Sequence, residues 1–388
     1  MSPRMLTILK SYISRHAAEH ARQVARYFAL IAALFALSGD AESQSQEGFP
    51  SVVRCNAMVT DAAAVPATLA SDRQRIYFGT SNGIMAALDK SSLERVWRTE
   101  LGGEFVSNVL TVEGGHVAVT NPTGNSGPGG DVSRIHSLSS SSGVPVWTAK
   151  LPQSERYFLG RINGSVAAVA QNGAIYLFDA LTGALQRQFA ERGRVSARPY
   201  FYPTGVVFGT VEKRVISLSS QDAEFSAKQL SEYVPTAVIS LKDGNLAVGD
   251  ERGTLSIIDR QDARPIWKFK SGGAISSITE TDEGLLLTSL DNFVYLVSDY
   301  NGDVIWKRRL TGRIVDGGLL MNGLFVAVIY GENSVFLIDR RKGKVAGVVL
   351  LAEKELTSRA PALTGEHTFA LTSAESIETY SIGPCPVK

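Results

Sequence analysis

The stretch from residue 246 to residue 269 reads LAVGDERGTLSIIDRQDARPIWKF, and it contains the structural unit from which most of the chain is built. Three short apolar runs, at 246–249, 255–258 and 265–269, are separated by polar turns at hairpin spacing, and Gly253 lies where a turn needs a positive φ angle. The apolar residues do not follow the i, i+3, i+4, i+7 pattern of a helix. The stretch therefore predicts consecutive antiparallel β-strands.

The same unit recurs at a fixed period. Asp179, Asp259, Asp299 and Asp339 close similar apolar runs, and they are separated by 80, 40 and 40 residues. The residues one position earlier keep the same spacing: Leu138, Phe178, Leu218, Ile258 and Ile338. A period of about 40 residues is that of a propeller blade, whereas the main competing repeat, a helical solenoid, would need helical patterning.

Seven complete units can be counted, and they begin near residues 65, 105, 155, 195, 233, 274 and 314. The second unit is longer, and the Gly/Pro-rich segment 121–130 is expected to form a surface loop there. An eighth unit begins after residue 357 but lacks an outer strand, while residues 51–59 form a strand without a unit of their own. We therefore predict an all-β, eight-bladed propeller of four-stranded antiparallel blades, closed by the N- and C-terminal strands in one blade.

The N-terminal segment predicts export. Basic residues precede an apolar run at 27–37, which is too short to span a membrane comfortably and is followed by small residues. Residues 1–43 are therefore interpreted as a signal peptide, with an uncleaved N-terminal anchor as the alternative, and residues 48–388 as the propeller. The expected location is the periplasm or the cell envelope, with association to a membrane through a partner or through an uncleaved anchor.

The two cysteines of the chain, Cys55 and Cys385, fit an exported protein. One lies in the predicted closing strand and the other near the C-terminal end, so closure of the ring would bring them together. We predict a disulfide bond between them, and the alternative is two free thiols.

Few residues indicate chemistry. The net charge of +1 provides no broad basic surface, so nucleic acid is not expected as a partner. His16, Glu19 and His20 match a zinc-binding pattern, but they precede the apolar core of the signal and would be removed with it. No catalytic set, metal site or cofactor site can be assembled from the sequence, so we expect a protein that is not an enzyme.

The repeated phrase, an apolar-Ala-Leu-Asp strand, a Gly-containing turn and a tryptophan, resembles the repeat of pyrroloquinoline-quinone (PQQ) type propellers, for example from Ile84 to Trp97 and from Ile175 to Gly183. In such a repeat the tryptophan is expected to pack between adjacent sheets, and the aspartate to cap a turn by accepting backbone N–H groups. The repeat specifies the fold well and function poorly, because its members include enzymes, sensors and scaffolds.

Within this class, the chain resembles the BamB family of outer-membrane β-barrel assembly factors in length, in its eight units and in its signal. Segment 189–199 is similar to that family's partner-contacting Leu-x-Leu-Arg-Gly-x-Ser-Ala-Pro segment, with Arg192 matching the arginine, Phe189 in place of the first leucine and Glu191 in place of the second. Glu232 occupies an acidic place in the next inter-unit segment. The resemblance implies a partner-binding face that includes Phe189, Arg192 and Glu232, whereas the alternative is that Arg192 and Glu232 pair with each other or with solvent.

The predicted function is that of an exported, non-catalytic scaffold that binds an envelope protein, such as a β-barrel assembly factor. A ligand-sensing propeller is one alternative, and a PQQ-dependent dehydrogenase is another. The dehydrogenases are usually much longer, with inserted loops and an adjacent pair of cysteines, and this chain has neither the extra length nor the paired cysteines.

Overall fold

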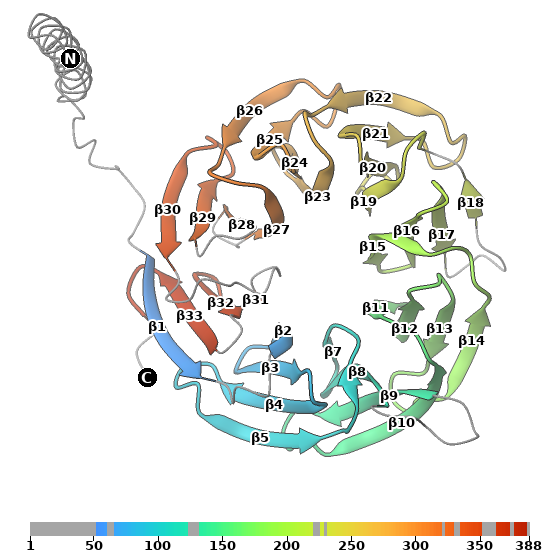
Figure 1. Cartoon of the computed structure of the whole chain (residues 1–388), viewed down its shortest axis with the longest axis vertical. Coiled ribbons are helices and arrows are strands. Elements are labelled where there is room, and N and C mark those ends of the chain that lie inside the picture. The colour runs from blue at the N-terminus through green and yellow to red at the C-terminus, as the bar shows by residue number, and fades with distance from the viewer. Residues whose placement is uncertain are drawn as a thin grey trace, which may run out of the picture. The chain divides into compact units, whose positions relative to one another are not determined.

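The computed structural model describes residues 52–59, 66–122, 132–219, 226–228, 231–319, 323–329, 334–350, 362–372 and 376–385. The chain divides into two units, residues 1–49 and 50–388, and every described residue belongs to the second. That unit is a ring of eight antiparallel sheets (Figure 1), so the predicted eight-bladed, all-β propeller is confirmed. The predicted signal peptide or anchor lies outside the described residues. In the described part of the chain, no helix is long and apolar enough to cross a bilayer.

The first four blades follow one another along the chain, and each is built from consecutive strands. Blade 1 contains β2 (Pro66–Ser71), β3 (Arg75–Thr80), β4 (Ile84–Asp89) and β5 (Arg95–Glu100). Blade 2 contains β6 (Glu104–Phe105), β7 (Leu110–Val112), β8 (Gly115–Asn121), β9 (Val132–Ser139) and β10 (Pro145–Pro152). Blade 3 contains β11 (Tyr157–Ile162), β12 (Ser165–Ala170), β13 (Ile175–Phe178) and β14 (Leu185–Phe189), and blade 4 contains β15 (Val195–Tyr202), β16 (Gly205–Thr210), β17 (Val215–Ser219) and β18 (Ser226–Lys228).

The remaining blades continue around the ring, and the last one combines both ends of the described chain. Blade 5 contains β19 (Pro235–Ser240), β20 (Leu246–Asp250), β21 (Thr254–Ile258) and β22 (Pro265–Lys270). Blade 6 contains β23 (Ile275–Thr281), β24 (Gly284–Ser289), β25 (Phe293–Val297) and β26 (Val304–Arg309), and blade 7 contains β27 (Ile314–Leu319), β28 (Leu324–Ile329), β29 (Ser334–Asp339) and β30 (Val345–Leu350). Blade 8 contains β31 (Ala362–Leu363), β32 (Thr368–Thr372), β33 (Ser376–Ile382) and β1 (Val52–Val59).

The predicted unit boundaries agree with these blades, and blade 2 differs from the prediction in one respect. Its inner strand is divided into β6 and β7, which both pair with β8, so the blade has five strands instead of four. The division lies at Ser107 and Asn108, which turn toward blade 3: the Asn108 side chain exchanges two hydrogen bonds with the backbone of Leu159. The interruption of the strand therefore joins two blades.

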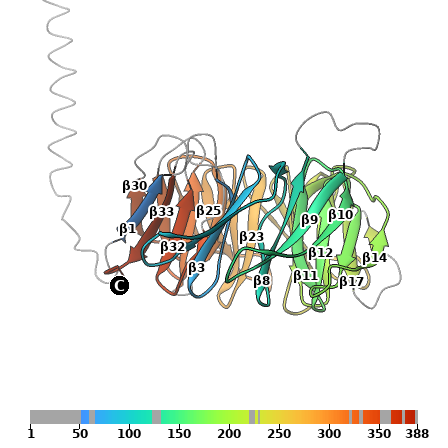
Figure 2. The ribbon, with the colours of Figure 1, turned by 90° about the horizontal axis from the view of Figure 1, so that it is seen from below.

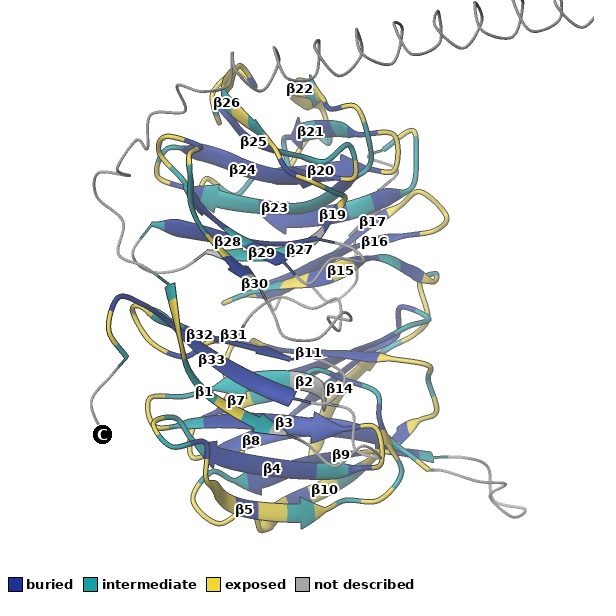
Figure 3. Ribbon diagram, turned by 60° about the vertical axis from the view of Figure 1, so that its left-hand side comes forward, coloured by how far each residue is buried: buried dark blue, intermediate teal, exposed yellow. Residues whose placement is uncertain are grey.

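The apolar core lies between the blades. Among the described residues, buried side chains form eight clusters, and each cluster joins one pair of neighbouring blades. Middle strands such as β16 and β28 are buried on both faces, because each face meets another sheet. Outer strands such as β5 expose most of their side chains to solvent, as the exposed outer edges in Figure 3 show.

Aspartates cap the turns that precede the outer strands, as predicted. The Asp89 carboxylate accepts the backbone N–H groups of Ser91 and Ser92, at 2.8 and 3.1 Å. Asp179, Asp259 and Asp339 make the same pair of bonds. The expectation was wrong for Asp299: Ser298 begins that turn, since the N–H of Gly302 donates to its carbonyl, and Asp299 lies one residue too far along to act as the cap.

Tryptophans connect four pairs of blades, as the repeat implied. The indole Nε1 of Trp97 donates to the Ser140 carbonyl in the turn of blade 2, at 2.9 Å, and the ring covers Gly143 in that turn. A Cβ at Gly143 would lie 2.5 Å from the ring, so the approach requires glycine. The equivalent pairs are Trp147 with Gly183, Trp267 with Gly302, and Trp306 with Gly343.

Blade 8 closes the ring, and its outer strand is β1, which pairs with β33 over residues 52–59 (Figures 1 and 2). The pairing joins residues more than 300 positions apart, which confirms the predicted closure. The Arg54 guanidinium lies 3.4 Å from the buried Glu378 carboxylate, and the Tyr380 hydroxyl also donates to Glu378. A charge pair therefore accompanies the strand pairing.

The structure joins Cys55 to Cys385 by a disulfide, with their Cα atoms 5.5 Å apart. Cys55 is the extra residue of a bulge between Arg54 and Asn56, and after β33 the chain turns back at Gly383, whose φ is +96°. The Ser381 hydroxyl holds this turn by donating to the Pro384 carbonyl, at 3.0 Å. Oxidation of the two thiols in the exported protein stays a prediction.

Candidate functional site

The three predicted contact residues lie in or beside two consecutive connections between blades. Phe189 is the last residue of β14, and Arg192 lies in the link 190–194 that leads inward from blade 3 to blade 4. Glu232 lies in the next such link, which leads from blade 4 to blade 5. We call the surface formed by links 153–156, 190–194 and 231–234, together with the neighbouring turns 171–174, 211–214 and 251–253, the linker face.

The backbone of the link that carries Arg192 is held firmly. The Gln171 side chain donates to the Val195 carbonyl at 2.8 Å, the N–H of Val195 donates back to the Gln171 carbonyl at 2.8 Å, and the N–H of Val211 donates to the Arg194 carbonyl at 2.9 Å. Gly173 permits the close approach of the turn, because a Cβ there would lie 2.5 Å from the Gly193 carbonyl oxygen. The exposed Arg192 is therefore presented from an ordered loop.

A hollow of about 350 Å³ opens beside this link, and acidic, amide and basic side chains line it. Arg194 forms a two-pronged ion pair with Glu155 of the preceding link, at 2.7 and 3.3 Å. The Asn172 amide donates to Glu191 at 2.6 Å. The hollow therefore combines acidic, amide and basic side chains that are partly paired with one another.

Phe189 and Glu232 contribute in different ways. Phe189 is half-buried against the apolar cluster between blades 3 and 4, and the Arg187 guanidinium lies 4.7 Å from its ring centre. Glu232 is exposed, and Tyr233 beside it lies under the Arg252 guanidinium at 5.6 Å. The surface is therefore charged and includes two aromatic rings that are each partly covered by an arginine.

The segment that resembles the family's contact sequence also contains a structural residue that the sequence reasoning missed. The Ser196 hydroxyl donates to the Pro235 carbonyl at 2.7 Å, and thereby joins the inner strands of blades 4 and 5. Thr236 and Ser276 make the equivalent bonds to Ile275 and Ile314. These hydroxyl residues are spaced by 40, so the repeat itself carried the signal.

The described residues contain no group of three or more histidine, cysteine, aspartate or glutamate side chains that could hold a metal ion.

The closed ring of four-stranded blades, with aspartate-capped turns and tryptophans between sheets, places the chain in the class of PQQ-type propellers. The sequence model described as "Outer membrane protein assembly factor BamB" matches residues 31–155 and 222–360, about two thirds of the chain. The chain belongs to this family. The matched residues include Glu232 and leave out 156–221, where Phe189 and Arg192 lie.

Comparisons with individual proteins agree. The outer membrane protein assembly factor BamB of Shewanella oneidensis is 21% identical over 327 residues, which cover 79% of this chain and 76% of that protein. The crystal structure of BamB from Moraxella catarrhalis superposes with a TM-score of 0.64 at 15% identity and covers 85% of this chain and 97% of that one. The C-terminal WD40 domain of Sif2 gives a TM-score of 0.71 at 9% identity, over 87% of this chain and all of that one. The structural likenesses establish the fold alone.

Proposed function

We propose that this protein is an exported scaffold that supports outer-membrane protein assembly by binding an assembly factor in the cell envelope through its linker face. Membership of the BamB family carries the proposal, since the family model and the Shewanella oneidensis relative are both described as outer membrane protein assembly factors. The expected compartment is the periplasm, because assembly of outer-membrane proteins takes place there.

The linker face supports binding in physical terms. Arg192 is exposed on a link whose backbone is fixed, and an arginine offers a planar fork of donors for a carboxylate or for backbone carbonyls. Glu232, exposed on the next link, supplies the opposite charge. Two charges of opposite sign on neighbouring links can select the orientation of one partner.

The test is the exchange of both residues in the full-length protein, Arg192→Ala with Glu232→Ala. Cross-linking in intact cells, followed by mass spectrometry, should recover an outer-membrane β-barrel assembly protein with the wild type and lose it with the double variant. The matched control is Arg264→Ala with Glu94→Ala, which removes one charge of each sign from exposed turns before outer strands. This control should retain the partner.

The two parts of the proposal fail in different ways. If the wild type recovers no assembly protein, the proposed function is wrong. If wild type and double variant recover the same assembly protein equally, the function stands and the linker face is not its binding surface.

A further inference from the structure

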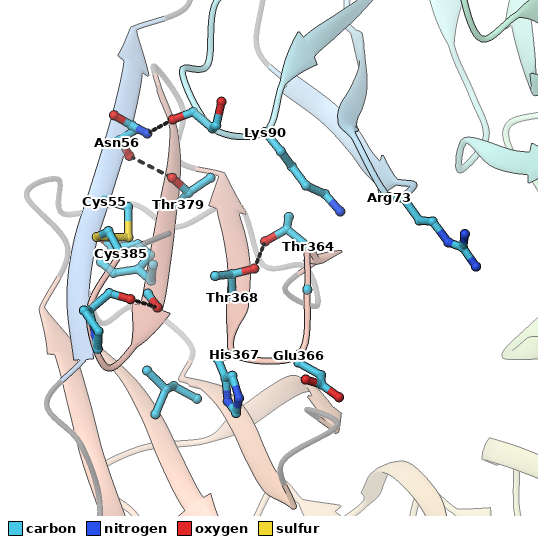
Figure 4. A pocket seen from close by; sticks show the side chains of 16 residues that line it. Cys55, Asn56, Arg73, Lys90, Thr364, Glu366, His367, Thr368, Thr379 and Cys385 are labelled. Carbon is cyan, nitrogen blue, oxygen red and sulfur yellow. Dashed lines mark hydrogen bonds between the residues drawn. A yellow bond between two sulfur atoms is a disulfide. The ribbon is translucent and has the colours of Figure 1, made fainter. Parts of the chain in front are cut away.

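A cavity of about 690 Å³ lies between blades 8 and 1. Its walls include Asn56 and Thr368 of blade 8 and Lys90 of blade 1, and Figure 4 shows these side chains around it. The disulfide between Cys55 and Cys385 forms a further wall (Figure 4). The volume falls within the range of about 300–1,000 Å³ that is usual for ligand pockets.

The wall that blade 8 contributes is rich in hydroxyl groups. Successive side chains of a strand point to opposite faces, and Ile377 of β33 and Ala370 of β32 pack against blade 1. Thr379 and Ser381 follow Ile377 at steps of two residues, and the pairing of β32 with β33 contains no bulge. Thr368 precedes Ala370 by two residues. All three hydroxyl side chains therefore face blade 1, and all three line the cavity.

Part of the hydrogen-bonding capacity of this wall is left for a ligand. The Thr368 hydroxyl accepts a bond from Thr364 at 2.9 Å, and its own hydrogen atom makes no bond to another described residue. The Asn56 amide donates to the Ser91 carbonyl at 2.6 Å, and its side-chain oxygen accepts no bond from the described part of the chain. A donor and an acceptor suit ligand hydroxyl groups, each of which can both donate and accept.

Blade 1 supplies positive charge. Lys90 is half-buried, its ammonium group donates to the Asp72 carbonyl, and the side chain extends toward the hairpin that carries Thr364 (Figure 4). The exposed Arg73 also lines the cavity. Neither cation forms an ion pair with a carboxylate of the described residues. Glu366 is the acidic side chain among the lining residues and lies on the exposed hairpin of blade 8.

Two nearby carboxylates already have other partners. Asp72 attracts Lys90, but its carboxylate accepts bonds from two backbone N–H groups at 2.8 Å and from the Tyr77 hydroxyl at 2.6 Å. Asp89 caps its own turn by accepting the N–H groups of Ser91 and Ser92. A half-buried ammonium group without a paired carboxylate is stabilised by an anion.

We propose that this cavity binds a small sugar that carries a carboxylate or a phosphate group. Lys90 and Arg73 bind the acidic group, whereas Thr368, Thr379 and the Asn56 amide bind the sugar hydroxyls. Lysine and arginine donate charge-assisted bonds to carboxylate and to phosphate alike, so the walls admit both groups. The site shares no residue with the linker face and does not depend on the proposed function.

The probes are glucuronate and glucose phosphorylated on its primary hydroxyl, and their binding to the full-length, oxidised protein is measured by isothermal titration calorimetry at low salt. Glucose lacks the charge, glucosamine reverses it, and inorganic phosphate lacks the sugar. Each of these three should bind about tenfold more weakly, or worse, than the better acidic sugar, which in turn names the acidic group. Glucose that binds as tightly as both acidic sugars, or no binding of either acidic sugar at millimolar concentration, would overturn the proposal.

Charge variants locate the acidic group. Lys90→Gln with Arg73→Gln should weaken binding of the acidic sugar about tenfold or more and leave binding of glucose unchanged. The matched control is Lys268→Gln with Arg309→Gln, which removes two exposed cations from the outer strands of blades 5 and 6 and should bind as the wild type does. The double variant of the linker face should also bind as the wild type does, so either proposal can fail alone. Unchanged binding in the first variant overturns the site.

Two further measurements address the sugar itself. Thr368→Val removes one hydroxyl at nearly constant volume and should weaken binding of glucuronate and of glucose by similar factors. A glucuronate derivative that carries a diazirine gives an answer even if a variant does not fold. Irradiation should attach it to residues 364–368, 379–385 or 90–91, and attachment elsewhere overturns the assignment.

Discussion

The junction between blades 6 and 7 and the junction between blades 8 and 1 perform the same task with different groups. In the first, Trp306 covers Gly343 and donates to the Arg340 carbonyl at 2.9 Å, so one side chain of an outer strand joins the two sheets. In the second, Asn56 makes the bond to the turn, and a cavity remains beside it. Blade 8 is instead held by long-range strand pairing, an ion pair and a disulfide.

The difference shows how the repeat distributes stability. Tryptophan-joined junctions depend on residues 32 to 43 positions apart, whereas blade 8 depends on residues more than 300 positions apart. A contact that closes a longer loop costs the chain more conformational entropy. The pairing of β1 with β33 therefore has a greater entropic cost to offset than a contact between neighbouring blades. A covalent bond at that place reduces the entropy of the unfolded chain.

The largest expected effect is on the closing strand. Deletion of residues 48–60 removes β1 and leaves β33 as an unpaired edge, which should cause aggregation and a lower melting temperature. Size-exclusion chromatography and thermal unfolding measure both, and deletion of residues 44–47 is the control. A shortened chain that stays monomeric with an unchanged melting temperature would contradict the assigned role of β1.

The disulfide should have the next largest effect. Cys55→Ser with Cys385→Ser should lower the free energy of unfolding by about 4–5 kcal/mol, since the bond closes a very long loop. Urea unfolding measures this change, and the wild type in reductant should match the variant. Non-reducing peptide mapping of the exported protein checks the bond directly, and two alkylatable thiols would contradict it.

Acid should weaken blade 2 and its tryptophan-joined neighbours rather than blade 8. His116 and His136 are buried on the face of blade 2 that meets blade 1, and burial lowers the pKa of each to about 4. The His116 ring lies 3.5 Å from the Tyr77 ring, centre to centre, and Asp72 and Arg75 are the nearest charges; Arg134 is the charge near His136.

Each histidine binds a proton more readily in the unfolded chain, where the pKa of its side chain is about 6.5. Their stabilising effect is therefore complete above pH 6.5 and is lost as the pH falls toward 4, by about 3 kcal/mol per residue. In urea unfolding between pH 7 and 4, His116→Phe should lose less stability than the wild type. The exposed His367→Phe is the control, and identical pH profiles for all three proteins would refute the assignment.

The smallest expected effect distinguishes turns with and without a tryptophan. Gly343→Ala places a Cβ 2.5 Å from the Trp306 ring at a φ of +63°, and should cost about 1–3 kcal/mol. Ala263 occupies the same turn position at a φ of +59° before an outer strand, and Ala263→Gly should change stability by about 1 kcal/mol or less. Equal changes in stability for the two variants, measured by thermal unfolding, would contradict the conclusion that the Trp306 ring requires glycine at position 343.

The fold could be predicted because each blade repeats the same local chemistry. Asp179, Asp259 and Asp339 recur at two repeat lengths of 40 residues, and strands with turns at that period allow few architectures. Asp299 shows the limit of the approach: it satisfies the period, but the turn begins at Ser298, and only the backbone hydrogen bonds settle that difference.

The candidate sites were harder to predict, because they depend on which blades become neighbours. The sequence indicated Arg192 and Glu232 as charges on consecutive links, but it could not show that Arg194 pairs with Glu155 or that a hollow lies beside them. The cavity next to Asn56 needs the ring to be closed before its two walls meet. Ser196, Thr236 and Ser276 were accessible from the period, but small hydroxyl residues are common in strands and turns.

Because β1 pairs with β33, the first strand has to wait during synthesis until nearly the whole chain has been made. At about 5–20 residues per second, the 330 residues between Cys55 and Cys385 take roughly 16–66 s to emerge from the ribosome. Throughout that interval the first strand has no partner, while the strands of the following blades can pair with neighbours that are already made. The nascent chain therefore exposes an unpaired strand until the last blade has been made, which makes newly made protein more prone to aggregation than the finished ring.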